Sequence, residues 1–132
     1  MADTLTADQA NELALWFSDL ADAIGDYRTL NWNNLSEGQR QELGTAEDDL
    51  RNASTDLVEL ALRLRLEELN STLARIKGAT DQMKSAIKHL QNVQRAIRIA
   101  TAAVTLAGAI VSMDPAAIAE GISGAISAAS GE

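Results

Sequence analysis

The side chains that could act as acids or bases are few, and their spacing does not suit catalysis. His89 is the only histidine, and no carboxylate stands three or four residues away from it in the sequence. A histidine that serves as a general base usually lies within hydrogen-bond reach of a carboxylate or a nucleophile. The sequence therefore predicts that His89 is a solvated or interface residue and that the protein is not an enzyme.

Metal and phosphate sites have no support either. The acidic runs Glu47-Asp48-Asp49 and Glu67-Glu68 lack the Glu-x-x-His companions of a four-helix di-iron site. The chain has no cysteine, which excludes thiolate metal sites and disulfides. Gly121-Ile122-Ser123-Gly124 lacks the Lys-Ser/Thr pair of a phosphate-binding loop. We expect no metal ion and no cofactor.

A cationic stretch offers a different kind of chemistry, because it could contact anionic lipid. Six Lys and Arg residues lie between positions 75 and 98, with Asp81 as the only acid among them. Met83, Ile87 and Leu90 would share the opposite face of a helix, a layout typical of basic amphipathic helices that bind membrane surfaces. The candidates for contact with lipid, or with acidic residues of the protein itself, are Lys84, Lys88, Arg95 and Arg98.

The cationic stretch is followed by a C-terminal region with almost no charge. Residues 99–113 carry none, and residues 116–131 carry only Glu120. Neither arm reaches the roughly 20 apolar residues of a stable transmembrane helix, so we expect conditional insertion rather than permanent residence in a membrane. The candidates for insertion are Ile97, Val104, Leu106, Gly108, Ile110, Val111, Ile118, Ile122 and Ile126.

The elements that must position these residues are predicted from caps and apolar spacing. Thr6 and Gln9 form a capping box at the start of a helix over residues 6–30. Its stripe holds the bulky packing residues Trp16, Phe17, Leu20 and Ile24. A similar box at Ser36 and Gln39 begins a second helix.

The central helices show heptad spacing, and their ends are harder to place. Leu50, Leu57 and Leu64 belong to a seam that predicts a helix over residues 36–77. Gly78 then favours a stop, with Thr80 as the cap of a helix over residues 80–113, although the apolar rhythm also permits one unbroken helix over residues 36–113. Asp114 and Pro115 are typical of a helix start and predict a last helix over residues 115–129.

Charge and composition restrict the partners. The net charge of −8 is uneven: residues 1–60 sum to −10, residues 61–98 to +5 and residues 99–132 to −3. The negative net charge argues against general nucleic-acid binding, because neutralising phosphates requires basic residues. No basic-then-apolar signal peptide opens the chain, so we expect a soluble protein that is cytoplasmic or exported by a non-classical route.

These observations together predict one all-α domain over residues 1–132. We expect an elongated bundle of three to four helices, with long heptad-patterned central helices and a C-terminal Ala/Gly-rich helical hairpin, and no strand. Heptads of this length favour a homo-oligomer. At the level of class, the design resembles α-helical pore-forming proteins or toxin components, which shield a weakly hydrophobic hairpin in the soluble form. The alternative is a helical interaction or scaffold module that binds a helical protein and has no membrane role.

Overall fold

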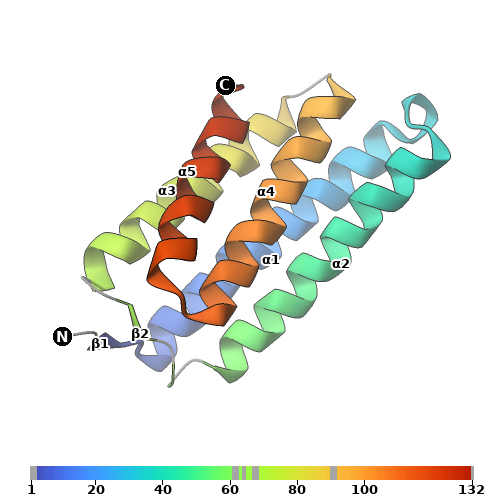
Figure 1. Cartoon of the computed structure of the whole chain (residues 1–132). Coiled ribbons are helices and arrows are strands. Elements are labelled where there is room, and N and C mark those ends of the chain that lie inside the picture. Colours follow the sequence, from blue (N-terminus) through green and yellow to red (C-terminus); the bar gives the residue numbers. More distant parts are fainter. Residues whose placement is uncertain (1–2, 61–62, 64, 67–68, 90–91, 132) are drawn as a thin grey trace.

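The protein is all-helical apart from one minimal strand pair, as its computed structural model shows (Figure 1). The structure describes residues 3–60, 63, 65–66, 69–89 and 92–131. Within these residues the elements are β1 (Asp3–Thr4), α1 (Ala7–Leu30), a short 3-10 turn (Trp32–Asn34), α2 (Glu37–Glu59), β2 (Arg65–Leu66), α3 (Leu69–Lys88), α4 (Val93–Ser112) and α5 (Pro115–Ser130). The predicted all-α class is confirmed, but the described part of the chain packs five α-helices rather than the predicted three to four, because the chain also breaks between α2 and α3.

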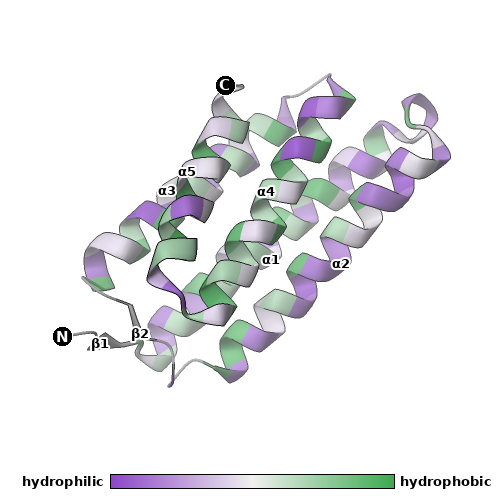
Figure 2. Ribbon diagram, viewed as in Figure 1, coloured by the Kyte–Doolittle hydropathy of each residue, from purple (hydrophilic) through white to green (hydrophobic). Residues whose placement is uncertain are grey.

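The five helices form two layers. α1 lies between α2 and α3, and we call these three helices the three-helix layer (Figure 1). α4 and α5, the C-terminal pair, pack on each other and lie over this layer, with α4 against α2 and α5 against α3. Figure 2 shows that α2 carries many hydrophilic residues, whereas most of α4 and α5 is hydrophobic or neutral.

The core lies between the layers and is built mainly from aliphatic side chains. Phe17, Leu20 and Ile24 of α1 are fully buried, and Trp16 packs against them from a half-buried position. Leu50 and Leu57 of α2 are also fully buried. One chain therefore covers this part of the α2 seam by itself. Leu64, the third seam residue singled out in the sequence, lies outside the described residues.

Local capping chemistry explains three of the helix starts. At α1 the Thr6 hydroxyl accepts from the Gln9 amide at 3.1 Å, and the Gln9 side chain accepts from the Thr6 amide at 3.0 Å. The same reciprocal box forms between Ser36 and Gln39 at α2. Asp114 accepts from the Ala116 amide at 3.1 Å, and Pro115 follows it as the first residue of α5. These caps satisfy amides that have no partner inside the helix.

The predicted break at Gly78 is wrong, and so are the predicted helices over residues 36–77 and 80–113. α3 runs without interruption through Gly78. The residues expected to stop it instead stabilise it, because Lys77 forms an ion pair with Asp81 one turn later at 2.8 Å. The Thr80 hydroxyl donates to the Lys77 carbonyl rather than capping a new helix. Since Met83 and its neighbours on the same face are fully buried, packing outweighs the low helix propensity of glycine.

The chain breaks elsewhere, so a single helix over residues 36–113 is also wrong. α2 ends at Glu59, and β2 pairs with β1 in antiparallel register, Thr4 opposite Arg65. No strand was expected, yet the sequence alternates Leu and Arg from Leu62 to Leu66, which is the period of a strand. The second break precedes α4, where the Asn92 side chain accepts from the Arg95 amide at 3.2 Å and caps the helix.

Candidate functional site

The C-terminal pair holds the residues expected to enter lipid, and it turns most of their apolar side chains inward. Leu106 and Ile110 of α4 are fully buried, and Ile118 and Ile122 of α5 are nearly so. The half-buried members of the set are Ile97, Val104 and Val111. Ile126 remains 38% exposed, and Gly108 lies on the outer surface. In this form of the protein the insertion candidates therefore stabilise the bundle.

α4 and α5 approach each other closely at one glycine. A Cβ atom placed on Gly121 would lie 3.2 Å from the Leu106 Cα and 3.1 Å from its Cδ1. A side chain at position 121 would therefore require Leu106 to shift by a few tenths of an ångström, and part of that contact is with backbone. A Cβ on Gly108 would meet no atom within 4 Å, because it would point to solvent. The two glycines therefore have different roles. Gly121 permits close contact between α4 and α5, and Gly108 leaves the outer surface of α4 without a protruding side chain.

The outer face of the C-terminal pair carries mainly small, uncharged residues. A shallow trough of about 880 Å³ runs between α4 and α5 on this side. Thr101, Thr105, Gly108 and Ser112 line it from α4, and the charged residues Arg98 and Glu120 are part of its lining. The lining of the trough is mostly small apolar and hydroxyl residues, while the larger side chains of Leu106 and Ile110 are buried.

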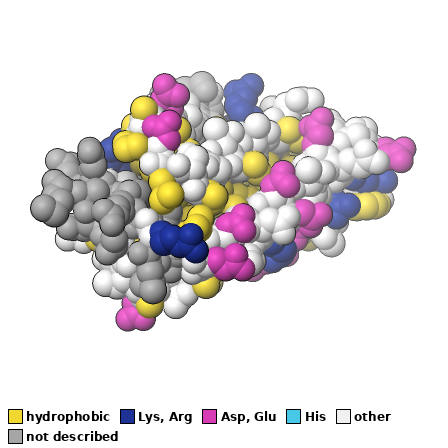
Figure 3. All heavy atoms as spheres, turned by 60° about the horizontal axis from the view of Figure 1, so that its bottom comes forward, with side chains coloured by type: hydrophobic (Ala, Val, Ile, Leu, Met, Phe, Trp, Pro, Cys, Tyr) yellow, Lys and Arg dark blue, Asp and Glu magenta, His cyan; other side chains and the backbone are white. Residues whose placement is uncertain are grey.

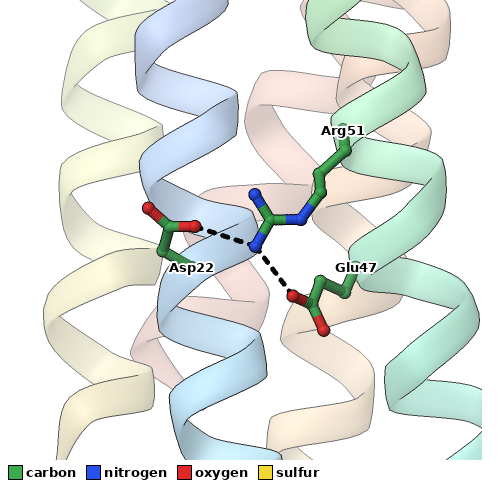
Figure 4. A network of polar contacts seen from close by, with 3 residues as sticks. All are labelled: Asp22, Glu47 and Arg51. Carbon is green, nitrogen blue, oxygen red and sulfur yellow. Dashed lines mark hydrogen bonds and ion pairs between the residues drawn. The ribbon is translucent and has the colours of Figure 1, made fainter.

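Polar contacts connect the helices of the three-helix layer. The Arg51 guanidinium of α2 contacts Asp22 of α1 and Glu47 of its own helix, each at 2.8 Å (Figure 4). Hydrogen bonds to Glu47 and to Asp22 raise the pKa of Arg51 above its ordinary value. Ser54 of α2 donates to the Ala14 carbonyl of α1 at 2.8 Å.

The C-terminal pair has a polar contact of its own. The Arg95 guanidinium near the start of α4 donates to the Ala129 carbonyl near the end of α5 at 2.6 Å. A cation at that place also suits the negative end of the α5 dipole. Among the described residues, no side-chain hydrogen bond or ion pair joins α4 or α5 to the three-helix layer. Apolar packing is what holds the two parts together there.

The four cations singled out in the sequence have different environments. Lys84 of α3 lies 3.7 Å from Asp19 of α1, which matches the alternative that these cations contact acids of the protein itself. Arg95 is half-buried against α5. Lys88 and Arg98 are exposed and make no ion pair within the described part of the chain. Of the four, these two are therefore accessible to a charged partner.

A cluster at the turn between α1 and α2 was not predicted from the sequence. The Trp32 ring contacts two guanidinium groups, with the Arg28 Cζ 4.9 Å and the Arg40 Cζ 4.3 Å from its centroid. Trp32 is 42% exposed and the neighbouring Leu30 is 83% exposed. This turn lies at the same end of the molecule as the start of α4 (Figure 1). In the sequence, a tryptophan flanked by Arg28 and Arg40 is the signal that could have indicated this cluster.

α4 is longer than the uncharged run suggested. It begins at Val93, six residues before Ile99, and its 20 residues are long and apolar enough to cross a bilayer by length and composition. It is the one such helix in the described part of the chain, and core helices of soluble proteins meet the same criterion. The uncharged run itself remains shorter than roughly 20 apolar residues, and α4 reaches its length because it also includes Arg95 and Arg98.

No protein-family model, curated protein or solved structure matches this chain. Within the described residues, no group of three or more His, Asp or Glu side chains could hold a metal ion. The class that the fold defines is an all-helical protein in which a C-terminal helix pair covers a three-helix layer.

Proposed function

We propose that this protein is a non-enzymatic, membrane-active helical protein whose C-terminal pair leaves the three-helix layer and inserts into a lipid bilayer. The observation that carries the proposal is the distribution of polar contacts in the described residues: they lie within each part and not between the two. Lipid chains can replace apolar packing, but they cannot replace an ion pair or a hydrogen bond. Separation of the pair would therefore leave the described polar contacts of both parts intact.

The composition of the pair supports insertion as several copies. α4 has the length of a membrane span. Its outer face carries Thr101, Thr105 and Ser112 around Gly108, and small and hydroxyl residues of this kind form helix interfaces in lipid. Glu120 on α5 would be costly against lipid chains, so it favours a position facing other copies or water. We infer a homo-oligomeric inserted form, comparable in kind to α-helical pore-forming proteins and toxin components.

Docking on the membrane would involve one end of the molecule. Lys88 and Arg98 are exposed near the connection between α3 and α4, and the turn with Leu30 and Trp32 lies at the same end (Figure 1). Cations near an anionic surface contribute about 1 kcal/mol each. Tryptophan is enriched at the interface between lipid and water. This end is therefore the side that we expect to meet anionic lipid first.

Dye release from liposomes tests the proposal, with anionic and neutral lipid compared across about pH 4.5 to 7.5. Gly108→Asp should strongly reduce release, because it places a charge in the uncharged part of α4, four residues before the helix ends, where an aspartate costs up to about 3 kcal/mol in a bilayer. The soluble fold should survive the change, since the position faces open space.

Gly78→Asp is the matched control for this test. It makes the same exchange at another open position within a helix, but in the three-helix layer. Release should persist in this variant. Equal loss in both variants would count against insertion of the C-terminal pair.

A helical interaction module is the second candidate function, and one observation favours it. Burial in the core of the bundle is enough to explain the apolar character of four insertion candidates, without any membrane. These residues are Leu106, Ile110, Ile118 and Ile122. Absence of both dye release and lipid co-sedimentation under every condition would leave this function and a helical protein as the partner.

A further inference from the structure

A groove between α2 and α4 is open in the folded bundle. It has a volume of about 710 Å³ and is open to solvent along its length. Figure 3 shows a band of hydrophobic side chains on one face of the molecule, with a row of acidic side chains beside it. The groove is lined by Gly38, Gln41, Glu42, Thr45, Ala46 and Asp49 of α2 and by Ile97, Ala100, Thr101, Val104 and Thr105 of α4.

The charged residues that line the groove are both acidic. Glu42 and Asp49 are both exposed on the α2 wall and are seven residues apart, about 10 Å along a helix. Neither makes an ion pair or a side-chain hydrogen bond with another described residue. The two arginines of α2 are engaged elsewhere: Arg51 contacts Asp22, and Arg40 lies over the Trp32 ring. Lys and Arg are absent from the described lining, so the groove itself supplies no counter-charge to either carboxylate.

The floor of the groove suits the apolar stripe of a helix. Ala46 and Ala100 are buried at the bottom, and their small side chains leave room for larger ones from a partner. Ile97 and Val104 of α4 are half-buried and present apolar surface to the groove. They lie about two helical turns apart on the same face of α4. Helices that pack over alanine approach to about 8 Å between their axes.

Two other occupants fit less well. An anionic membrane surface would be repelled by Glu42 and Asp49. A second copy of this chain offers exposed cations on α3, including Arg75 and Lys88, but the exposed face of α3 carries no large apolar side chain in its described residues. Neither supplies an apolar stripe flanked by cations.

We propose that the α2–α4 groove binds a cationic amphipathic helix of a partner protein. Its apolar stripe would contact Ile97 and Val104, and its Lys or Arg residues, two turns apart, would pair with Glu42 and Asp49. This binding does not depend on the membrane activity proposed above, because the groove exists in the folded protein before any insertion.

A designed peptide serves as the probe. It is a fluorescently labelled helix of roughly 18 residues with a Leu/Ala stripe and lysines seven residues apart beside the stripe. Its matched control carries glutamates in place of those lysines. Fluorescence anisotropy with the full chain at about 20 mM salt should show saturable binding of the lysine peptide and none of the glutamate peptide. Absence of saturable lysine-peptide binding, or equal binding of both peptides, would overturn the proposal.

Two double variants of the protein locate the binding. Glu42→Gln with Asp49→Asn should weaken the lysine peptide about tenfold, since each exposed pair contributes a modest amount. Asp48→Asn with Glu59→Gln makes the same change in net charge on α2 at exposed positions outside the groove lining, and should leave binding unchanged. An equal loss in both double variants would show that net charge alone attracts the peptide and would overturn the assignment to this groove.

Discussion

Tyr27 carries a hydroxyl that folding removes from water without providing a partner. The residue is 4% exposed, and its hydroxyl has no hydrogen-bond partner among the described residues. A buried polar group left in this state costs about 1–3 kcal/mol. Tyr27→Phe removes the hydroxyl and keeps the ring, so we expect the free energy of unfolding at pH 7 to rise by about 1 kcal/mol. Urea denaturation measures it, and a loss of stability would show that the hydroxyl has a favourable contact.

The same residue gives a pH dependence with a defined sign. Burial raises the pKa of Tyr27 above its ordinary value of 10.0, so the unfolded chain loses this proton first as the pH rises. The native protein should therefore lose stability above pH 10, by at most about 1.4 kcal/mol per pH unit, until the folded pKa is reached. Tyr27 is the only tyrosine, so the difference between wild type and Tyr27→Phe isolates this effect from other titrations.

Residue-level features were predictable where their partners are close in sequence. The capping box of Thr6 and the start at Asp114 need only three or four adjacent residues, and both are present. Arg95 was predicted as a contact for lipid or acids, yet its guanidinium contacts Ala129, 34 residues away. No local pattern contains that information, because it depends on the way α5 packs against α4.

At the scale of the helix, the same Gly→Ala substitution should have opposite effects on stability at two positions. Gly78→Ala in α3 should stabilise the protein by about 0.5–1 kcal/mol, because a Cβ there meets nothing within 4 Å and alanine has the higher helix propensity. Gly121→Ala should destabilise it, since the new Cβ would lie 3.2 Å from the Leu106 Cα. Urea denaturation of both variants checks the pair. Equal signs would contradict either the continuity of α3 at Gly78 or the close approach of α4 and α5.

Helix ends inside the apolar rhythm were the least predictable elements. The spacing of apolar residues continues across both real breaks, so periodicity alone could not locate the end of α2 or the start of α4. At Gly78 the local signals favoured a stop. The burial of Ile76 and Met83 in the core favours a continuous α3, and burial of that kind depends on neighbouring helices that the local sequence does not describe.

At the scale of the whole molecule, the order of the helices could not be predicted from their stripes. Leu, Ile and Ala repeat on most of the helices, so several pairings bury similar apolar area. The seam of α2 was taken as a sign of a homo-oligomer, yet Leu50 and Leu57 are buried within one chain. Self-association of the folded form would therefore need a different surface from this seam.

If the C-terminal pair must leave the three-helix layer to insert, a covalent connection between the two should block membrane activity. The chain has no cysteine, so Ala46→Cys with Ala100→Cys places two thiols on the floor of the α2–α4 groove, and loss of both free thiols on oxidation verifies the disulfide before release is measured. Ala14→Cys with Ser54→Cys creates a control pair inside the three-helix layer, where the two residues are already in contact.

Dye release from anionic liposomes should cease when the Ala46–Ala100 pair is oxidised and return on reduction, because the disulfide holds α4 on α2. The control pair should permit release in both redox states, since the three-helix layer does not open in the proposed mechanism. Release that persists with the groove disulfide formed would show that membrane activity needs no separation of the C-terminal pair. Loss in both oxidised proteins would instead point to a rearrangement within the three-helix layer itself.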